Sequence, residues 1–459
     1  MKVYFIIILF TAITTQEIYT EYLIIDLDTI DTFSYQIPSD YDNNMSHPLL
    51  LTFHQWGGNE NSNYYTQFDE EANNRNWILL SPYGGAPNNY NHQGMQSMVE
   101  QEILWMIENY NINTQKIYMV GGSMGGATGA IYANNHLDPT KPMVAATASA
   151  SGILDCERRA IEMDGNNSMI EWFGGEWYEV PFEYHRNSAV YFEDSTQSMH
   201  YNLQHTPLYL DFGSTEPHRN HAEDLYDLLE NYNMNMWIDE NPQGVHGYSV
   251  FDEEHVCNWL SQYELIDNPN VINVNLDEPS RAYWIEAKGQ LNNTDFIRIH
   301  TKMNEYNNFD LYNFSNSDSL IFHNTINENN TELIINIQFV SNQYFIGLSG
   351  QDFNLINEIG ASGIINNNSE PLNINIQNQV AWISIPNTEL EKIEILISYL
   401  SNDINQDSIW NIIDIIIVLN YILGQGELNN EQQYNADMNN DNVINIIDII
   451  GIVNLILNN

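Results

Sequence analysis

Short apolar runs alternate with helical patterns from about Glu21 to Tyr263. Runs of this kind, bounded by turn residues, are typical of buried parallel strands, and the patterns between them are typical of covering helices. The order predicts an α/β domain with a mostly parallel sheet over residues 21–265. The runs are PLLLTF from Pro48, NWILLSP from Asn76, KIYMVG from Lys116, MVAATASAS from Met143, PLYLDFG from Pro207 and MNMWID from Met234.

Apolar residues at helical spacing form two faces that would cover the sheet. They are Val99, Ile103, Ile107 and Tyr110, and then Leu225, Leu228, Leu229 and Tyr232. A capping box formed by Ser97 and Glu100 predicts that the first of these helices begins near Ser97.

A strand pattern with a period of two residues follows the Asn-Pro-Asn stretch at residues 268–270. It predicts an antiparallel, sandwich-like β-domain over residues 270–400, and no cluster of titratable residues there predicts catalysis. Trp284 and Trp382 leave two functions open, a sugar-binding module in which they stack on a pyranose ring, or a spacer in which they are core. The spacer is favoured because Trp382 lies within an alternating strand pattern. The alternating residues are Ile335, Ile337 and Phe339, then Leu372, Ile374 and Ile376, and then Ile393, Ile395, Ile397 and Tyr399.

The first residues have the layout of a secretory signal peptide, with Lys2 before an apolar run from Val3 to Ile13 and small or polar residues after it. We therefore expect residues 1–16 to be removed and the mature protein to be extracellular. The apolar run is too short to cross a bilayer, and no later segment is long and apolar enough, so no membrane span is expected. Cys156 and Cys257 could form a disulfide in that compartment or could both be free and buried.

Charge excludes some partners. The chain has 13 Lys and Arg against 61 Asp and Glu, a formal net charge of -48. Such a surface repels phosphate backbones and anionic lipid headgroups, so nucleic acid is not an expected partner.

The clearest catalytic motif is GGSMG at residues 121–125, which lies between a predicted strand and a predicted helix. A serine on such a sharp turn projects its hydroxyl above the edge of the sheet, and only small neighbours permit the turn. Ser123 is therefore the predicted nucleophile. The amide of Met124, at the start of the helix, is the first predicted donor to an oxyanion.

From about Tyr35 to Leu260 the chain resembles the extracellular esterase branch of the α/β-hydrolases, which includes feruloyl esterases, acetylxylan esterases and polyhydroxybutyrate depolymerases. The resemblance rests on PLLLTFHQWGG, NWILLSPYGG, KIYMVGGSMGG and GVHGY, in that order. It implies that the amide of Trp56 is the second oxyanion donor and that His54 is structural. Gln55 stands where that family has glycine, so the geometry of this loop is where the chain departs from it.

The remaining members of the expected Ser-His-acid triad follow the nucleophile in the chain order of this fold. His246 lies in a loop between glycines, after the last strand pattern, where the resemblance places the general base. The family pattern Gly-x-x-Asp aligns Glu216 with the acid, and glutamate replaces aspartate in some members of the fold. Asp211, on the preceding strand, is the alternative acid.

These residues predict a serine hydrolase that forms an acyl-enzyme and needs no metal or organic cofactor for catalysis. The expected substrates are feruloyl or acetyl esters on polysaccharides. The alternatives are a polyhydroxyalkanoate-type polyester depolymerase, a peptidase of the prolyl-oligopeptidase type, and a non-catalytic binding or scaffold protein with an inactive hydrolase domain. The loop from Ser81 to Gly94 and the aromatic insertion from Asp164 to Phe192 are candidates to line the pocket.

Two C-terminal segments, DINQDSIWNIID and DMNNDNVINIID, repeat the ligand spacing of an EF-hand loop. In such a loop, positions one, three, five, seven, nine and twelve supply oxygens to Ca²⁺. The predicted ligands of the two ions are Asp403, Asn405, Asp407, Ile409, Asn411 and Asp414, and then Asp437, Asn439, Asp441, Val443, Asn445 and Asp448.

A loop and a helix that occur twice, with Asp at position twelve and no entering helix, resemble type I dockerins. This resemblance implies a dockerin-like domain over residues 402–459 and a cohesin-like docking partner. The positions that choose the cohesin in that family are here Ile412, Ile413, Ile446 and Ile447. A calcium-stabilised terminal module without a docking role is the alternative.

Overall fold

The computed structural model describes residues 17–305, 307–323, 332–338, 344–350, 356–366, 368–386, 390–399, 404–405, 411–439, 441 and 443–458. The signal peptide expected at residues 1–16 lies outside these residues. Among the described helices, none has the length and apolar character needed to cross a membrane.

An eight-stranded sheet forms the centre of the N-terminal part, in the order β1-β2-β4-β3-β5-β6-β7-β8. β1, β2 and β4 pair antiparallel, and every pair from β4 through β3 to β8 is parallel. This is the α/β-hydrolase fold that the sequence predicts. The strands are β1 (Ile18–Ile25), β2 (Asp28–Gln36), β3 (His47–Phe53), β4 (Ile78–Pro82), β5 (Ile112–Gly122), β6 (Ala146–Ala150), β7 (Leu208–Gly213) and β8 (Met236–Asn241).

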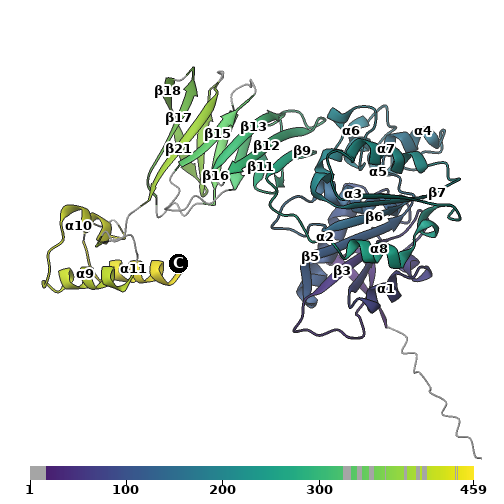
Figure 1. Cartoon of the computed structure of the whole chain (residues 1–459), viewed down its shortest axis with the longest axis horizontal. Helices are drawn as coiled ribbons and strands as arrows, with labels where there is room; N and C mark the ends of the chain where they lie inside the picture. Colours follow the sequence, from purple (N-terminus) through teal and green to yellow (C-terminus); the bar gives the residue numbers. More distant parts are fainter. Residues whose placement is uncertain are drawn as a thin grey trace, which may run out of the picture.

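Helices cover both faces of this sheet (Figure 1). α2, α3 and α7 pack on one face, and α1 and α8 pack on the other. Burial of apolar side chains on both faces explains why the central strands read as continuous apolar runs. The helices are α1 (Phe68–Asn74), α2 (Gln93–Asn109), α3 (Met124–Asn135), α4 (Cys156–Glu162), α5 (Ile170–Phe173), α6 (Pro181–Arg186), α7 (Arg219–Leu229) and α8 (Glu253–Leu260).

The predicted start of α2 at Ser97 is wrong. α2 begins at Gln93, where the side chain of His92 accepts a hydrogen bond from the amide of Met95. The hydroxyl of Ser97 instead donates to the carbonyl of Gln93, one turn earlier in the same helix. A serine can therefore satisfy its hydroxyl inside a helix as well as cap one, and the capping box did not identify the true helix start.

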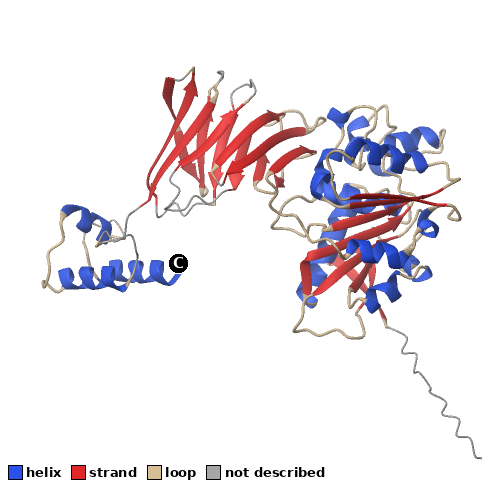
Figure 2. Cartoon of the chain, viewed as in Figure 1, coloured by secondary structure: helices blue, strands red, loops and turns tan. Residues whose placement is uncertain are grey.

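The middle part is a β-sandwich of a six-stranded and a seven-stranded sheet, and Figure 2 shows its strands joined by loops. Most pairs are antiparallel, as predicted, but β13 with β15 and β14 with β16 are parallel. The strands are β9 (Val271–Leu276), β10 (Arg281–Ala282), β11 (Ile285–Lys288), β12 (Ile297–Glu305), β13 (Asn308–Ser315), β14 (Ser319–His323), β15 (Glu332–Ile337), β16 (Tyr344–Ser349), β17 (Ile356–Ile365), β18 (Asn368–Leu372), β19 (Ile374–Gln377), β20 (Val380–Ile385) and β21 (Lys392–Tyr399).

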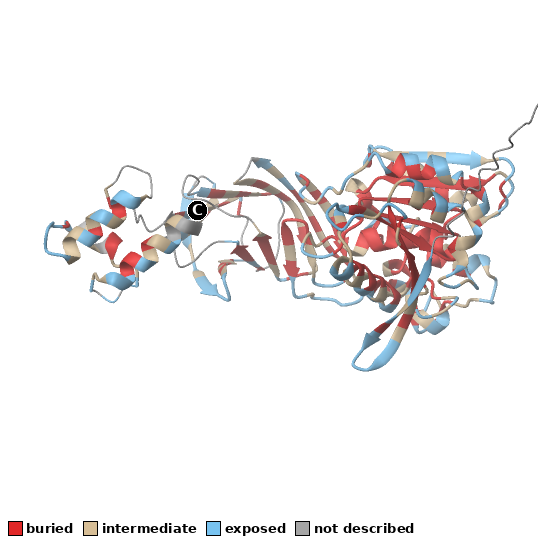
Figure 3. Ribbon diagram, turned by 90° about the horizontal axis from the view of Figure 1, so that it is seen from below, coloured by how far each residue is buried: buried red, intermediate tan, exposed pale blue. Residues whose placement is uncertain are grey.

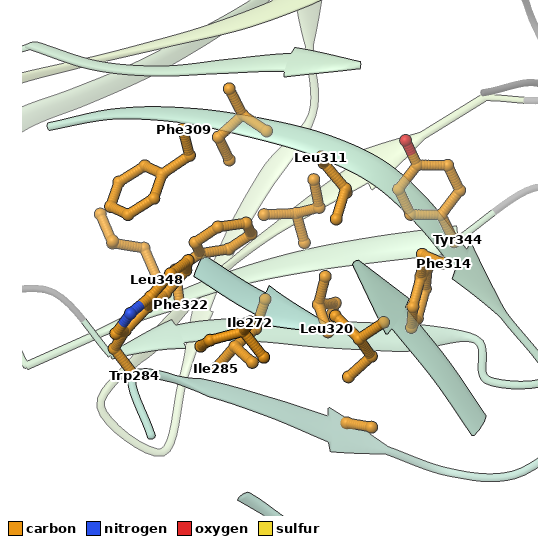
Figure 4. Close-up of a cluster of buried hydrophobic side chains, with 14 of the residues drawn as sticks. Ile272, Trp284, Ile285, Phe309, Leu311, Phe314, Leu320, Phe322, Tyr344 and Leu348 are labelled. Atoms are coloured by element: carbon orange, nitrogen blue, oxygen red, sulfur yellow. The ribbon is translucent and has the colours of Figure 1, made fainter. Parts of the chain in front are cut away.

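Alternation along these strands fills the space between the two sheets with apolar side chains. Figure 4 shows Trp284 in this core beside Phe322 and below Phe309, and its indole N–H donates to the carbonyl of Pro269 at 2.7 Å. Trp284 is therefore a core residue. Ile376, one of the alternating residues, is 48% exposed and therefore does not lie in this core. Phe339 lies outside the described residues.

Polar contacts join the sandwich to the hydrolase domain. Asn202 and Asn275 exchange two hydrogen bonds of 2.9 Å, one in each direction between side chain and backbone. The guanidinium of Arg186 donates to a carboxylate oxygen of Asp277 from two nitrogens, at 2.8 and 2.5 Å. Figure 3 shows buried positions continuing along the strands of both parts. The two parts are therefore joined by specific, partly buried contacts.

The C-terminal helices are α9 (Ile412–Ile422), α10 (Asn430–Ala436) and α11 (Ile446–Asn458). They share a small core of their own, which includes Val418, Ala436 and Ile452. Both loop-helix units of the predicted repeat contribute to that core.

Replacing Phe296 with alanine should loosen the junction between sandwich and hydrolase. Phe296 is fully buried, packs with Phe182 and Met199, and its ring centroid lies 4.9 Å from that of Phe182. We expect Phe296→Ala to lower the free energy of unfolding by about 3 kcal/mol in calorimetry, through lost burial and a cavity. Leu291→Ala, at a residue that is 65% exposed, is the control and should change little. Equal transitions for both variants would contradict the packing role.

Candidate active site

The turn between β5 and α3 holds Ser123 in a strained conformation, with φ 56° and ψ -120°. Its neighbours are small because space is lacking: a Cβ on Gly121 would lie 2.0 Å from the carbonyl oxygen of Gly125, and one on Gly125 would lie 2.4 Å from that of Phe53. The amide of Ser123 donates to the carbonyl of Ala150 on β6 at 2.8 Å. These contacts fix the backbone under the serine hydroxyl, as the motif predicts.

His246 reaches this hydroxyl from the loop after β8. Its Nε2 lies 2.7 Å from the Oγ of Ser123, and its Nδ1 faces Glu216. The loop is held by Tyr248, whose hydroxyl donates to the carbonyl of Phe53 at 2.7 Å. The ring of His246 is therefore oriented on both sides, as a general base needs to be.

Glu216, and not Asp211, meets His246. Its Oε2 lies 3.3 Å from the Nδ1 of His246, and the same oxygen accepts a hydrogen bond from the hydroxyl of Ser151. The carboxyl of Glu216 is buried. Ser151 was not foreseen from the sequence, because only the folded loop after β6 brings its hydroxyl to this carboxylate.

Asp211 lies within β7, and its carboxyl is in a different electrostatic environment from that of Glu216. Burial, with repulsion from Asp239 on the neighbouring strand and from Glu216, raises the pKa of Asp211 to about 8. A neutral carboxyl that does not touch the ring cannot stabilise an imidazolium. The geometry therefore favours Glu216 as the acid.

Gln55 does not distort the loop that carries Trp56. It is absent from the residues with positive φ, so a side chain is tolerated there, and its Oε1 accepts a hydrogen bond from the amide of Tyr248 at 2.9 Å. The amides of Gly57 and Gly58 are already bonded to carbonyl oxygens, which leaves the amide of Trp56 as the candidate donor of this loop. The glycine of the related family is thus replaced by a contact that ties this loop to the histidine loop.

His54 is structural, as expected. Its two ring nitrogens each lie 2.8 Å from a carbonyl oxygen, those of Gln55 and Tyr83, and the side chain is buried. The ring therefore braces the loop from below and does not reach the catalytic cavity.

A cavity of about 300 Å³ opens beside Ser123. Ser123, His246 and both predicted oxyanion residues, Met124 and Trp56, line it together. Tyr90 from the first candidate loop and residues 166 and 168 of the aromatic insertion complete part of the wall, so both loops named from the sequence contribute. Its volume and its mixture of apolar and polar lining residues suit an acyl group of moderate size.

A polar cluster at the end of this cavity was missed from the sequence. Arg159 and His218 line the cavity; the Nη1 of Arg159 lies 3.1 Å from the Nε2 of His218, and the Nδ1 of His218 lies 2.8 Å from a carboxylate oxygen of Glu162. Burial raises the pKa of Glu162, but hydrogen bonds from His218 and His221 outweigh that effect and hold the pKa below its usual range. The carboxylate therefore stays charged and holds Arg159 beside the nucleophile.

Glu162, His218 and His221 lie close enough together to hold a metal ion, but the hydrogen bonds of His221 leave its ring without a nitrogen lone pair for the metal. The Nδ1 of His221 accepts hydrogen bonds from the amides of Leu154 and Asp155, at 3.1 and 3.3 Å. The proton of the neutral ring is therefore on Nε2, the nitrogen that faces Glu162 at 3.7 Å, and no lone pair remains there for a metal. The cluster is best described as a hydrogen-bonded support for Arg159.

Cys156 and Cys257 are both free and buried. Burial raises the pKa of each thiol to about 12, so neither is a reactive thiolate at neutral pH. The sequence left open whether these two cysteines form a disulfide, and in the structure they do not.

In the second EF-hand-like loop, predicted ligand oxygens converge. The amide of Asp441 donates to the Oδ1 atoms of Asp437 and Asn439, both at 3.1 Å, which brings positions one, three and five together. Position twelve, Asp448, is fully buried and accepts from the amides of Met438 and Asn445 at 2.9 and 2.7 Å. Val443 and Asn445 lie in the same loop, with the side chain of Asn445 donating to the carbonyl of Val443. Carboxylate and amide oxygens in this arrangement fit a hard cation.

The first loop repeats this arrangement where it is described. Asp414 is fully buried, and its carboxylate accepts from the amides of Ile404 and Asn411, both at 3.0 Å, and from that of Asn405 at 3.2 Å. The remaining predicted ligands, Asp403, Asp407 and Ile409, lie outside the described residues.

Residues 401–457 match the dockerin type I domain family. That match covers the C-terminal loop-helix pair and agrees with the resemblance seen in the sequence. No curated protein sequence matches the chain.

Solved structures that cover about half of this chain include hydrolases. The fluorophosphonate-binding serine hydrolase F of Staphylococcus aureus has 13% identity and a TM-score of 0.43, over 53% of this chain and 98% of that one. A ferulic acid esterase has 16% identity and a TM-score of 0.40, over 54% and 96%. An esterase of Pyrobaculum calidifontis has 15% and 0.39, over 54% and 85%. Because these TM-scores lie below 0.5, the fold assignment depends on the strand order and the β5–α3 turn of this chain.

The choice between Glu216 and Asp211 is directly testable. We expect Glu216→Gln to lower kcat for a p-nitrophenyl ester by about 10³- to 10⁴-fold, because the amide neither fixes the tautomer of His246 nor stabilises its charged form. Asp211→Asn, a matched change of one buried carboxyl, should keep most of the wild-type kcat. The reverse ranking would assign the acid to Asp211.

Asp211→Asn should also reveal the raised pKa of this carboxyl in the pH dependence of stability. A folded-state pKa above the unfolded one means that stability is fully present below about pH 4 and is lost as the pH rises toward about 8. Relative to wild type, the variant should therefore gain unfolding free energy across that range, by roughly 3 to 5 kcal/mol. Urea unfolding at several pH values measures this difference, and a constant difference would show that Asp211 is ionised when folded.

Proposed function

We propose that this chain is a secreted serine esterase that hydrolyses carboxylic esters, of feruloyl or acetyl type, on polysaccharides. The observation that carries the proposal is the chain of contacts from Ser123 through His246 to Glu216. Ser123 lines a cavity together with the two oxyanion candidates, Met124 and Trp56. Hydrolase folds alone do not define a reaction, so the proposal rests on this geometry.

In the acylation half, His246 accepts the proton of Ser123 on Nε2 while Oγ attacks the ester carbonyl. The negative charge that develops on the carbonyl oxygen is met by the amides of Met124 and Trp56, and the dipole of α3 lies behind the first of them. Collapse of this intermediate breaks the bond to the alcohol, which leaves with the proton held by His246. The acyl group then remains on Ser123.

In the deacylation half, His246 takes a proton from water, and the resulting hydroxide attacks the acyl carbon. The same two amides receive the oxyanion. Ser123 leaves with the proton of His246, and the carboxylic acid is released. Glu216 holds the imidazolium in both halves, and Ser151 holds Glu216, which makes Ser151 a positioning residue.

The cavity supports an acyl group with an apolar body and a polar end. Met124, Ile153 and Met163 supply apolar contact, and Tyr90 supplies an aromatic surface. Arg159, at the polar end, offers donors to an oxygen of the substrate. A phenolic acyl group such as ferulate has both features, while acetate is small enough to fill only part of the cavity.

The C-terminal part is proposed to bind two calcium ions and to dock on a cohesin-like partner. Asp437, Asn439, Asp441, Val443, Asn445 and Asp448 would hold one ion, and Asp403, Asn405, Asp407, Ile409, Asn411 and Asp414 the other. Calcium supplies charge neutralisation to loops that each carry three aspartates.

Each repeat also carries an exposed apolar triad at the start of its helix. The triads are Ile412, Ile413 and Ile416, and Ile446, Ile447 and Ile450, and all six residues are at least 46% exposed. Apolar side chains at equivalent positions of two repeats favour a protein partner over a purely structural role.

The esterase proposal is tested by hydrolysis of p-nitrophenyl acetate and methyl ferulate. We expect Ser123→Ala to lower kcat/KM for both esters by about 10⁴-fold or more, since the nucleophile is lost. A p-nitroanilide of an N-capped dipeptide serves as the peptidase control and should not be cleaved. A polyhydroxybutyrate suspension separates the polyester depolymerase, which would clear it.

An inactive wild type that is folded and calcium-loaded would contradict the esterase proposal and favour a binding protein. Equal activity of wild type and Ser123→Ala would place the nucleophile elsewhere.

Calcium binding is tested by isothermal titration of the chelator-treated chain. Wild type should bind two ions, and Asp441→Ala should bind one, because it removes an exposed ligand at position five of the second loop only. Glu427→Ala, outside both loops, is the control. Two ions bound by Asp441→Ala would contradict the assignment of ligands.

A further inference from the structure

One outer face of the sandwich carries an aromatic and amide surface that the esterase reaction does not use. The strand register aligns Phe345 with Ser384, and Gly347 with Trp382, which in turn pairs with Asn375. The residues between them point inward to the core, since Ala381, Ile383 and Ile346 are buried there. Trp382 and its neighbours therefore face away from the core.

Gly347 gives the indole of Trp382 room to lie over the sheet. A Cβ on Gly347 would lie 3.1 Å from Cζ3 of that ring, 3.0 Å from Ile321 and 2.8 Å from Val380. A side chain at this position would push the ring away from the strand. With glycine, the ring lies against β16 and lines the hollow beside it.

The hollow has a volume of about 300 Å³. Phe345, which is 39% exposed, adds a second aromatic ring to its wall. The other lining residues are Ser319, Asn373, Ile374, Asn375, Gln377 and Ser384, and none of the lining residues is ionisable. Glu286, Lys288 and His323 interact at the β11 side of the same sheet. The carboxylate of Asp318 lies at the rim of the hollow, where it accepts a hydrogen bond from the hydroxyl of Ser319 at 2.6 Å.

We propose that this hollow binds a neutral polysaccharide chain. A pyranose ring presents an apolar face of C–H groups, which an aromatic ring covers, and a rim of hydroxyls, which amide and hydroxyl side chains bond. Uncharged amides do not repel a neutral sugar, while the net charge of -48 repels uronic acid polymers. The site holds the polymer on the sandwich and leaves the catalytic cavity free.

The test is affinity electrophoresis of the full chain in gels that contain arabinoxylan, barley β-glucan or galactomannan, with polygalacturonate as the charged comparison. Wild type should be retarded by at least one neutral polymer. Trp382→Ala should weaken that binding by about tenfold or more, while Trp382→Tyr should retain most of it. Trp237→Ala, a change of an exposed tryptophan on β8 of the hydrolase domain, is the control and should bind as wild type.

Hydrolysis of p-nitrophenyl acetate should be the same in all four proteins, so failure of this site and failure of the esterase are distinguishable. No retardation by any of the neutral polymers, retardation only by polygalacturonate, or equal retardation of wild type and Trp382→Ala would each overturn the proposal. A change of oligomeric state in Trp382→Ala, measured by light scattering, without a change in retardation would instead make this face a contact between copies of the chain.

Discussion

The site depends on one strained turn. Ser123 can keep a positive φ only because Gly121 and Gly125 let α3 approach β5 to within contact of bare backbone, and because its amide is anchored to β6. This turn places a hydroxyl above the sheet and an amide behind it at the same time. The strain is offset by the packing of the central sheet, whose strands are buried on both faces. Substrate specificity can then change in the surrounding loops without disturbing the nucleophile.

Near that turn, two buried carboxyl groups, those of Glu216 and Asp211, differ in ionisation behaviour because their surroundings differ. Glu216 has a hydroxyl donor and an imidazole on one oxygen, while Asp211 has Asp239 beside it and is held protonated. Glu216 is thus the carboxyl that faces His246, while burial and the charge of Asp239 favour the neutral form of Asp211, which does not contact the ring.

The sequence predicted the sheet and the turn at Ser123 because both are local: apolar runs and a motif of small residues directly encode them. It also predicted Glu216, but only from chain order and resemblance. What it could not predict depends on contacts between distant residues. Ser151, Arg159 and His218 reach the site only through folded loops, and Gln55 appeared as a defect until its bond to Tyr248 was visible. The face of the sheet on which Trp382 lies depends on the strand register. Alternation alone allows either face to be the inner one.

The excess of acidic residues has different consequences in different parts of the chain. In the C-terminal loops, grouped aspartates make a cation the natural counterpart, whereas none of the residues that line the hollow beside Trp382 is ionisable. A cation, Arg159, lines the cavity beside Ser123, and a carboxylate oxygen of the partly exposed Glu162 lies 3.3 Å from its guanidinium. A chain with so few basic residues thus places one of them beside Ser123, and the general repulsion of anions by its surface favours neutral polymers, as in the proposed function, over charged ones.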